Sequence, residues 1–287
     1  TSPLLAQEAR IVHYAYPVQH YERHIQGLLA TLLPGGCNQH LLASARLVID
    51  AAASKLKVPA AVVWEALLLA LVCHDLGKLT VPWQRRAQEI MAESARRQLA
   101  QEAGYAPEEW TDRLLSHTYQ TPDLERMRIG VDHAVAGAIL TVVVAEKWLA
   151  QLYPDLSNEA LGALLQLLFT IVADHHTPGA VTYDPQPLEA RAGRELERAL
   201  AALMKDRQNF GFPVEEIDAQ TLEQASRAAC QGLRTFQPQP FDLHALRFQP
   251  ASAHYLDYEA RVAAWRLYMM GSRLLRLADQ RSLVSTG

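Results

Sequence analysis

Hydrophobic residues recur along the chain with the spacing of a helix face, and the alternating β-branched runs typical of strands are nearly absent. This pattern predicts an all-α fold. Turn and capping residues, such as Pro34 before two glycines and Asn38, mark where helices end and begin. The expected helices cover about Gln19–Leu33, a stretch that begins after Asn38, Pro59–His74, Trp83–Ala103, Pro122–Leu152, Asn158–Asp174, Leu188–Lys205, Glu215–Leu233 and Tyr255–Val284.

Two of these helices, over residues 59–74 and 158–174, are apolar on all sides and are therefore expected at the centre of the fold. The polar segment 83–103 is expected at the surface, residues 177–186 as a loop, and residues 236–253, with three prolines, as an ordered connection. A chain of 287 residues suits one large domain. Its first residue is threonine rather than methionine, so a longer parent chain with fused domains stays open.

The composition limits the classes of partner. About half of the residues (49%) are hydrophobic, enough for a sizeable core, and the net charge of -4 gives no general attraction to nucleic acid or to an anionic membrane. Any contact with nucleic acid would therefore be local. The longest apolar stretch has eight residues, too few to span a membrane. Three scattered cysteines form no disulfide framework, and Cys73 and Cys230 are expected to be buried thiols, which fits a reducing cytoplasm.

His74 and Asp75 stand together at the end of the apolar helix over residues 59–74. Desolvating a carboxylate costs several kcal/mol, so such a pair needs a partner, and a metal ion compensates it best. Gly77 supplies the helix ending that lets adjacent side chains bind one ion. Lys78 adds a cation three residues further on, placed to meet an anionic substrate oxygen.

A second pair, His175 and His176, leaves the other apolar helix and is again followed by a glycine turn. The alternative for both pairs is helix capping through the dipole, which is worth about 0.3–1 kcal/mol. His40 and His133 also lie in apolar surroundings, where a lone histidine is otherwise a core residue. Asp279 continues an apolar helix face and needs a cation, for which neighbouring arginines are the simpler candidates.

Four short motifs carry a resemblance to a known family: CHDLGKL, DHAVAGAIL, ADHHTPG and LLRLADQRS. With His40 before them, their order resembles the HD superfamily of metal-dependent phosphohydrolases, and within it the HD nucleases associated with CRISPR systems. The resemblance implies an all-α HD fold with a helical insertion over residues 187–253. It also implies a metal-dependent phosphodiesterase that cuts nucleic acid, single-stranded DNA in CRISPR interference, and that works with a helicase or a CRISPR effector complex.

Carried over residue by residue, the resemblance implies two metal ions that share Asp75. His40, His74, Asp75 and Asp279 would hold one ion, and Asp75, His133, His175 and His176 the other. Mixed histidine and carboxylate ligands suit Mn, Fe, Co or Ni, and Mg could bind through the carboxylates. Two ions about 3.5–4 Å apart activate water near neutral pH and stabilise the oxygens at phosphorus, with Lys78 offsetting charge.

Three other functions stay open. A cyclic-dinucleotide phosphodiesterase shares the CHDLGKL motif, but Gly-Tyr-Pro is missing after the histidine pair. Asp279 also comes 103 residues after His176, whereas that branch places its final aspartate soon after the pair. A nucleotidase shares the His-Asp core, although many such enzymes bind one metal and would leave the histidine pair without a purpose. The third is a non-enzymatic HD-like domain of a conjugative relaxase, which should lack the complete ligand set.

Candidate contacts to nucleic acid are an aromatic residue, Trp83, and nearby arginines, which together could stack on and pair with a single strand. The arginines are Arg85, Arg86, Arg96, Arg97, Arg126 and Arg128. Interleaved glutamates favour a solvated, charge-mixed helix face instead. Asp174 is a candidate for orienting a ligand histidine. The remaining histidines, His13, His20, His24 and His117, match no family ligand and are interpreted as structural or surface groups.

Overall fold

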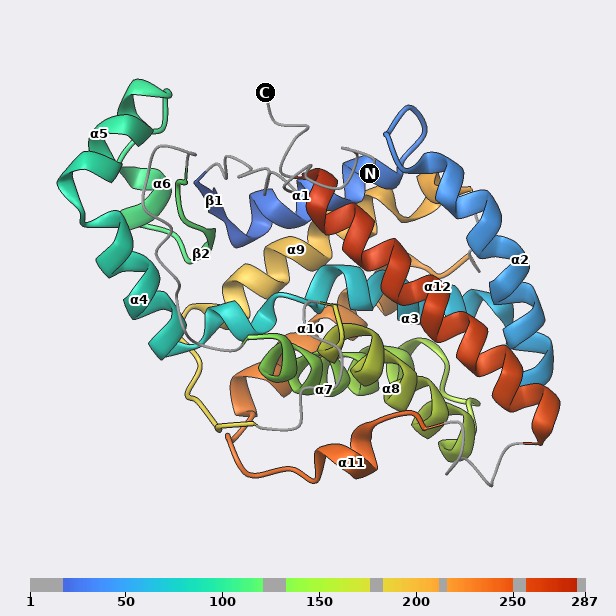
Figure 1. The fold of residues 1–287 in the computed structure, drawn as a ribbon. Coiled ribbons are helices and arrows are strands. Elements are labelled where there is room, and N and C mark those ends of the chain that lie inside the picture. Colours follow the sequence, from blue (N-terminus) through green and yellow to red (C-terminus); the bar gives the residue numbers. More distant parts are fainter. Residues whose placement is uncertain (1–17, 121–132, 176–182, 212–215, 250–256, 283–287) are drawn as a thin grey trace, which may run out of the picture.

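The computed structural model describes residues 18–120, 133–175, 183–211, 216–249 and 257–282 (Figure 1). Within these ranges helices dominate, as the hydrophobic pattern predicts, and the sole sheet is a pair of very short strands. The helices are α1 Tyr21–Leu32, α2 Gln39–Leu56, α3 Ala60–Cys73, α4 Val81–Met91, α5 Ser94–Glu102, α6 Glu108–Thr111, α7 Ala134–Leu152, α8 Asn158–Ala173, α9 Ala192–Asp206, α10 Ala219–Thr235, α11 Leu243–Leu246 and α12 Tyr258–Ser282, with 3-10 turns η1 Leu76–Leu79 and η2 Arg207–Phe210.

Helix α3 forms the centre of the molecule. All its residues after the first are buried, which is why its sequence is apolar on every side. Helices α1, α2, α7, α8, α9 and α12 pack around it, and α12 crosses the front of the molecule beside α2 (Figure 1). The second apolar helix, α8, ends close to the end of α3, so two core helices deliver their last residues to one place.

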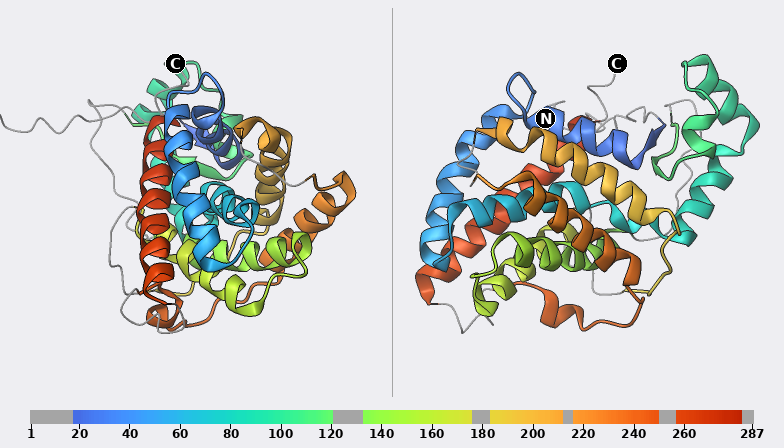
Figure 2. Two further views of the ribbon diagram at one scale, coloured as in Figure 1. Left: turned by 90° about the vertical axis from the view of Figure 1, so that its right-hand side faces the viewer. Right: turned by 180° about the vertical axis from the view of Figure 1, so that it is seen from behind.

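Helices α9 and α10, which occupy the segment expected as an insertion, pack on the same core. Figure 2 shows them from behind, on the side opposite α12. Their buried residues include Leu196, Leu200 and Ala229, which belong to the same hydrophobic cluster as α3. The segment is therefore part of the central packing in this structure.

Helix α7 meets the length and hydropathy criteria for a membrane span, as does the pair formed by α2 and α3, bent by 119°. However, 67% of the α7 window is buried inside the fold, between α3, α8 and α10. Core packing explains its apolar composition. Cys73 and Cys230 are buried free thiols, as predicted, whereas Cys37 is exposed.

Two helix predictions need correction. The segment 83–103 is two helices, α4 and α5, and the break lets Ala100 pack in one small cluster with Trp83 and Met91. The helix expected to run through His133 begins after it, at Ala134, with His133 at the N-cap position. The preceding residues 121–132 lie outside the described part of the chain.

A buried ion pair ties the centre to η2. Glu65 of α3 accepts hydrogen bonds from Arg207 Nε at 2.9 Å and from Trp148 Nε1 at 3.0 Å. Glu65 and Arg207 are 0% and 3% exposed. Burial raises the pKa of Glu65, and Arg207 opposes this rise. A buried carboxylate without its cation is strongly unfavourable.

We therefore expect Arg207→Met to lower the free energy of unfolding by about 3–5 kcal/mol, because it leaves the Glu65 carboxylate buried without a cation. Urea denaturation followed by circular dichroism measures the change. Arg227→Met is the control, since Arg227 forms an exposed pair with Glu223 and its loss should change little. A loss no larger than that of the control would show that Arg207 does not hold this charge.

Candidate metal centre

The centre of the site is the His74-Asp75 pair, where α3 ends. Both side chains are fully buried. The helix stops at Cys73 and the chain turns into η1, held by the Lys78 N–H donating to the Asp75 carbonyl at 2.8 Å. This change of direction allows both neighbouring side chains to point to the same side. His74 Nδ1 lies 2.9 Å from the Leu71 carbonyl, which leaves Nε2 directed into the site.

His24 on α1 is the residue that the sequence interpretation missed. Its Nε2 lies 3.3 Å from Asp75 Oδ2 and 3.3 Å from Asp279 Oδ1. Its Nδ1 faces Gln19 Oε1 at 3.3 Å, so this ring too is oriented by one nitrogen and offers the other. A signal was present: with Tyr21, Ile25 and other buried residues, His24 continues the apolar face of α1.

His40, the predicted first ligand, does not join this cluster. It is the second residue of α2 and is exposed, whereas the buried face of this helix contains Leu41, Ala45 and Ile49. At 100° per residue, His40 lies on the far side of the helix from Ala45. The structure therefore brings His24 rather than His40 to Asp75 and Asp279, and this corrects the assignment of His40.

Asp279 reaches the site from the last turn of α12 and is 9% exposed. Besides its approach to His24, its Oδ1 lies 3.6 Å from His74 Nε2. The sequence offered neighbouring arginines as partners instead. Among them, Arg281 donates to the Cys37 carbonyl and to Asn38 Oδ1, so it fastens α12 to the start of α2.

His133 and His175 complete the opposite side of Asp75. His133 Nε2 lies 3.6 Å from Asp75 Oδ1. The His175 ring is 5.3 Å from that of His74 and 5.8 Å from that of His133, measured between centroids. Its Nδ1 contacts the Val172 carbonyl, the same arrangement as His74 at the end of α3. His176, the other predicted ligand of this pair, lies outside the described residues.

Strand β2 Leu115–His117 adds a second histidine that sequence reasoning set aside. It pairs with β1 Gln19–His20, Gln19 opposite His117, immediately before α1. Ser116 Oγ donates to Asp75 Oδ2 at 2.9 Å. The His117 ring lies 4.6 Å from that of His24. No helical periodicity marks this short strand, so the sequence carried no signal for His117.

Lys78 is close to the pair, as predicted, but it is buried and engaged with the protein. Its Nζ lies 2.7 Å from Asp75 Oδ2 and 3.3 Å from His117 Nε2. It also lies 5.9 Å above the Trp83 ring. The cation therefore balances the Asp75 carboxylate at the edge of the site.

The charges in the cluster oppose the effect of burial. Burial alone would raise the pKa of Asp75, but His74 and Lys78 above all hold it well below its usual range. Burial likewise acts on Asp279, where hydrogen bonds from His24 and His74 hold its pKa well below normal. Both carboxylates are therefore ionised at neutral pH.

The histidines divide into two types. Burial lowers the pKa of His24, and burial together with Lys78 holds the pKa of His117 well below normal. These two rings are neutral at pH 7. For His74, burial also opposes the charge, but Asp75 and Asp279 outweigh it and raise its pKa above the ordinary 6.5.

These side chains form two groups with the geometry of metal ligands. Suitable donor atoms of His24, Asp75, His117 and Asp279 all lie within 4.8 Å of one another, as do those of His74, Asp75 and His175. Asp75 belongs to both groups. Nε2 of His24 and of His74, Oδ1 of Asp75 and Oδ1 of Asp279 are buried and face one another, and no donor or acceptor outside this cluster satisfies them among the described residues. Converging buried atoms of this kind fit divalent ions.

Close contact between η1 and α7 holds the two groups together. A Cβ on Gly77 would lie 2.0 Å from the His133 carbonyl oxygen, and one on Gly137 would lie 2.3 Å from the His74 carbonyl oxygen. No side chain fits in either place. The two glycines therefore allow the backbone that carries His133 to approach the His74-Asp75 pair.

The structure also places the predicted partner of a ligand histidine, Asp174, and several of the predicted contacts to nucleic acid. Asp174 accepts hydrogen bonds from Arg247 at 2.8 Å and from Tyr268 at 3.1 Å, which fasten the end of α8, and its role in orienting a ligand histidine stays a prediction. Trp83 is 3% exposed and cannot stack on a strand. Arg96 is also buried and donates to the Tyr119 carbonyl, whereas Arg126 and Arg128 lie outside the described residues.

The helical fold, with a His-Asp pair at the end of its central helix, defines an HD domain. The family model described as Cas3, HD domain matches residues 36–264, most of the chain. The chain therefore belongs to this family of CRISPR-associated HD nuclease domains. Comparison with curated proteins and with solved structures gave no match. His24 and Asp279 lie outside the matched segment, although the fold brings both to its centre.

Metal binding should release protons in a pH-dependent manner. A ligand histidine must be neutral, whereas the raised pKa of His74 favours its protonated form without metal. Lower pH therefore weakens metal affinity. We expect proton release from His74 on metal binding to be larger at pH 6.5 than at pH 8.5. Calorimetry with Mn in buffers of different ionisation enthalpy measures it; equal release at both pH values would contradict the charge assigned to His74.

Gly137→Ala should damage the site from the opposite side of the contact. The new methyl group forces α7 away from His74, and overpacking of this kind costs about 1–3 kcal/mol of stability. We expect a lower melting temperature and weaker metal binding. Gly162→Ala is the matched control, because a Cβ there meets nothing within 4 Å and replaces a helical glycine on α8. Equal behaviour of the two variants would rule out the close contact.

Proposed function

We propose that this chain is a metal-dependent nuclease that hydrolyses single-stranded DNA in CRISPR interference. Membership of the Cas3 HD-domain family supports the reaction class. The observation that carries the proposal is the sharing of Asp75 by two groups of buried donor atoms, since phosphodiester hydrolases commonly use two metal ions.

The residues divide between two ions. His24, Asp75 and Asp279, with His117 beside them, would hold one ion, and Asp75, His74, His133 and His175 the other. His176 is retained as a further candidate from the sequence. Divalent ions here would supply a nucleophilic water near neutral pH and would offset charge on the phosphoryl oxygens. A ligand set of histidines and carboxylates favours Mn, Fe, Co or Ni. Mg would bind more weakly, through the carboxylates.

The protein side chains perform the supporting work. Gln19 and the Leu71 and Val172 carbonyls fix which nitrogen of each histidine faces the site. Ser116 and Lys78 hold the Asp75 carboxylate in place. Burial of the cluster keeps bulk water away from the carboxylates, which strengthens each electrostatic contact. A helicase or a CRISPR effector complex would present the strand.

The test is cleavage of circular single-stranded DNA by metal-stripped protein to which Mn, Co, Ni or Mg is returned. We expect His24→Ala, like Asp75→Ala, to lose more than about 100-fold of the activity, since even outer partners of metal ligands contribute 10–100-fold. Metal content, measured by mass spectrometry, should fall in parallel. His40→Ala is the matched control and should cut as the parent does, because His40 is exposed on α2.

Each outcome points to a different conclusion. Loss of activity in His40→Ala with full activity in His24→Ala would refute the ligand set. Metal binding without DNA cleavage, but with hydrolysis of a cyclic dinucleotide or a nucleotide, would keep the metal centre and reject the proposed substrate. Circular DNA has no ends, so cleavage would also demonstrate internal cutting.

A further inference from the structure

Exposed side chains line one face of α12, the helix that carries Asp279. Its exposed large hydrophobic residues are Tyr258, Trp265 and Met269, which are 73%, 45% and 53% exposed. Arg273, Arg276 and Gln280 continue toward the end of the helix and are also exposed. Helix α12 lies at the outer edge of the described part of the molecule in the left view of Figure 2. An aromatic and apolar half is thus followed by a basic half.

These positions form one stripe. At 100° per residue, Trp265, Met269, Arg273, Arg276 and Gln280 fall within about 80° of helix surface. The rise from Trp265 to Arg276 is about 16 Å. Arg276 stands three residues before Asp279, and residues at that spacing are neighbours on a helix. The stripe therefore ends beside the candidate metal centre.

The charge of this helix face differs from that of the whole chain. Between residues 266 and 281 the sequence has four arginines and one acidic residue, Asp279, in a chain with a net charge of -4. Asp279 is buried in the site. Arg266, Arg273 and Arg276 form no ion pair with any described residue, whereas Arg281 is engaged with α2. These three exposed guanidinium groups suit phosphate oxygens.

The Trp265 ring packs on the Tyr268 ring, and Tyr268 is hydrogen-bonded next to the candidate metal centre. The two ring centroids lie 5.0 Å apart. The Tyr268 hydroxyl donates to Asp174 at 3.1 Å, and Asp174 directly precedes His175. The indole is thus held on an anchored ring, which is the arrangement of an aromatic platform for a base.

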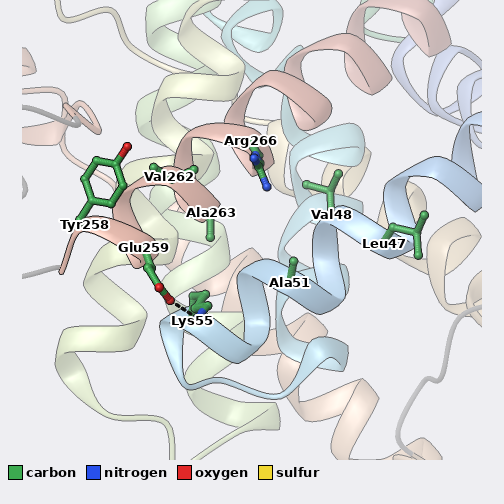
Figure 3. A pocket seen from close by; sticks show the side chains of 9 residues that line it. All are labelled: Leu47, Val48, Ala51, Lys55, Tyr258, Glu259, Val262, Ala263 and Arg266. Carbon is green, nitrogen blue, oxygen red and sulfur yellow. Dashed lines mark hydrogen bonds and ion pairs between the residues drawn. The ribbon is translucent and has the colours of Figure 1, made fainter.

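A groove of about 560 Å³ lies beside the stripe, between α2 and α12 (Figure 3). Leu47 and Tyr258 mark its two ends, and an ion pair between Lys55 and Glu259 lies across its lower side. Arg266 projects from α12 toward this groove. Lys55 and Glu259 neutralise each other, so Arg266 is the one cation without an ion-pair partner among the residues that line this groove, and the stripe offers more such charge to a phosphate backbone.

We propose that the exposed face of α12 guides a single strand of nucleic acid into the metal centre. Arg273 and Arg276 bind its phosphates, and Trp265 stacks on a base about four helical turns before Asp279. The inference rests on the nuclease function proposed above. It supplies a local basic surface on a chain whose net charge is -4.

Intrinsic fluorescence offers a direct probe. Of the five tryptophans, Trp64, Trp83, Trp110 and Trp148 are at most 4% exposed, so Trp265 is the one accessible to a ligand. We expect a 20-nucleotide oligo(dT), added to metal-free protein, to quench the emission. Trp265→Phe should abolish the quenching, and Trp265→Ala should weaken binding by about 5- to 150-fold, the range for one stacked base.

The charge test compares two double variants with the same change in net charge. Arg273→Glu with Arg276→Glu alters the stripe, and Arg194→Glu with Arg227→Glu alters α9 and α10 on the opposite side. Fluorescence anisotropy measures oligo(dT) binding across a salt series. We expect the stripe variant to bind at least tenfold more weakly than the control, with a salt slope lower by about 1.4, or about 0.7 for each lost contact.

Equal binding by the two double variants would overturn the proposal. So would a change in oligomeric state, seen by light scattering in Trp265→Ala with Met269→Ala, because it would assign this face to a second copy of the chain. The nuclease function is judged separately, by cleavage with the unaltered protein. Cleavage at parent rates by the stripe variant would reject the strand path alone, whereas no cleavage by the parent would reject the substrate.

Discussion

The structure depends on the burial of two carboxylates, Asp75 and Asp279, at one point of an apolar core. Removing such groups from water costs several kcal/mol each, so the chain must surround them with cations and hydrogen-bond donors. Six elements contribute: α1, the α3 end with η1, β2, α7, α8 and α12. Their convergence explains why α3 is buried on all sides and why segments far apart in the sequence meet at its end.

This constraint makes backbone contact as important as side-chain chemistry. His133 on α7 reaches Asp75 only because η1 and α7 lie in direct backbone contact. A Cβ atom would not fit between them, and Gly77 and Gly137 have none. The histidines are fixed by a common device, in which Nδ1 contacts a carbonyl or amide oxygen near the helix end. The geometry of the candidate ligands is thus set by residues that are not themselves ligands: two glycines, two backbone carbonyls and the Gln19 side chain.

The sequence predicted what depends on local pattern. The all-α fold, the central helices and the placement of Asp75, His175 and Asp279 followed from titratable residues interrupting apolar periodicity. The first ligand was assigned to His40 rather than His24 because both α1 and α2 contain a histidine, and the order of the family motifs does not distinguish between them. Helix phase does distinguish them: His24 continues a buried face, whereas His40 opposes one. His117 required the strand pairing, a contact across almost 100 residues that no local pattern reveals.

Charge balance links the metal centre to the surface of α12. Without metal, Asp75 and Asp279 face Lys78 and His74, whose raised pKa favours its cationic form, so positive charge offsets the two carboxylates. Two divalent ions would displace the His74 proton and leave a strong positive excess in a poorly hydrated pocket. A phosphodiester backbone is the anion that would compensate it, and the basic end of α12 extends the same attraction outward. In the proposed mechanism the buried carboxylates would hold the ions, and the arginines of α12 would draw the substrate to them.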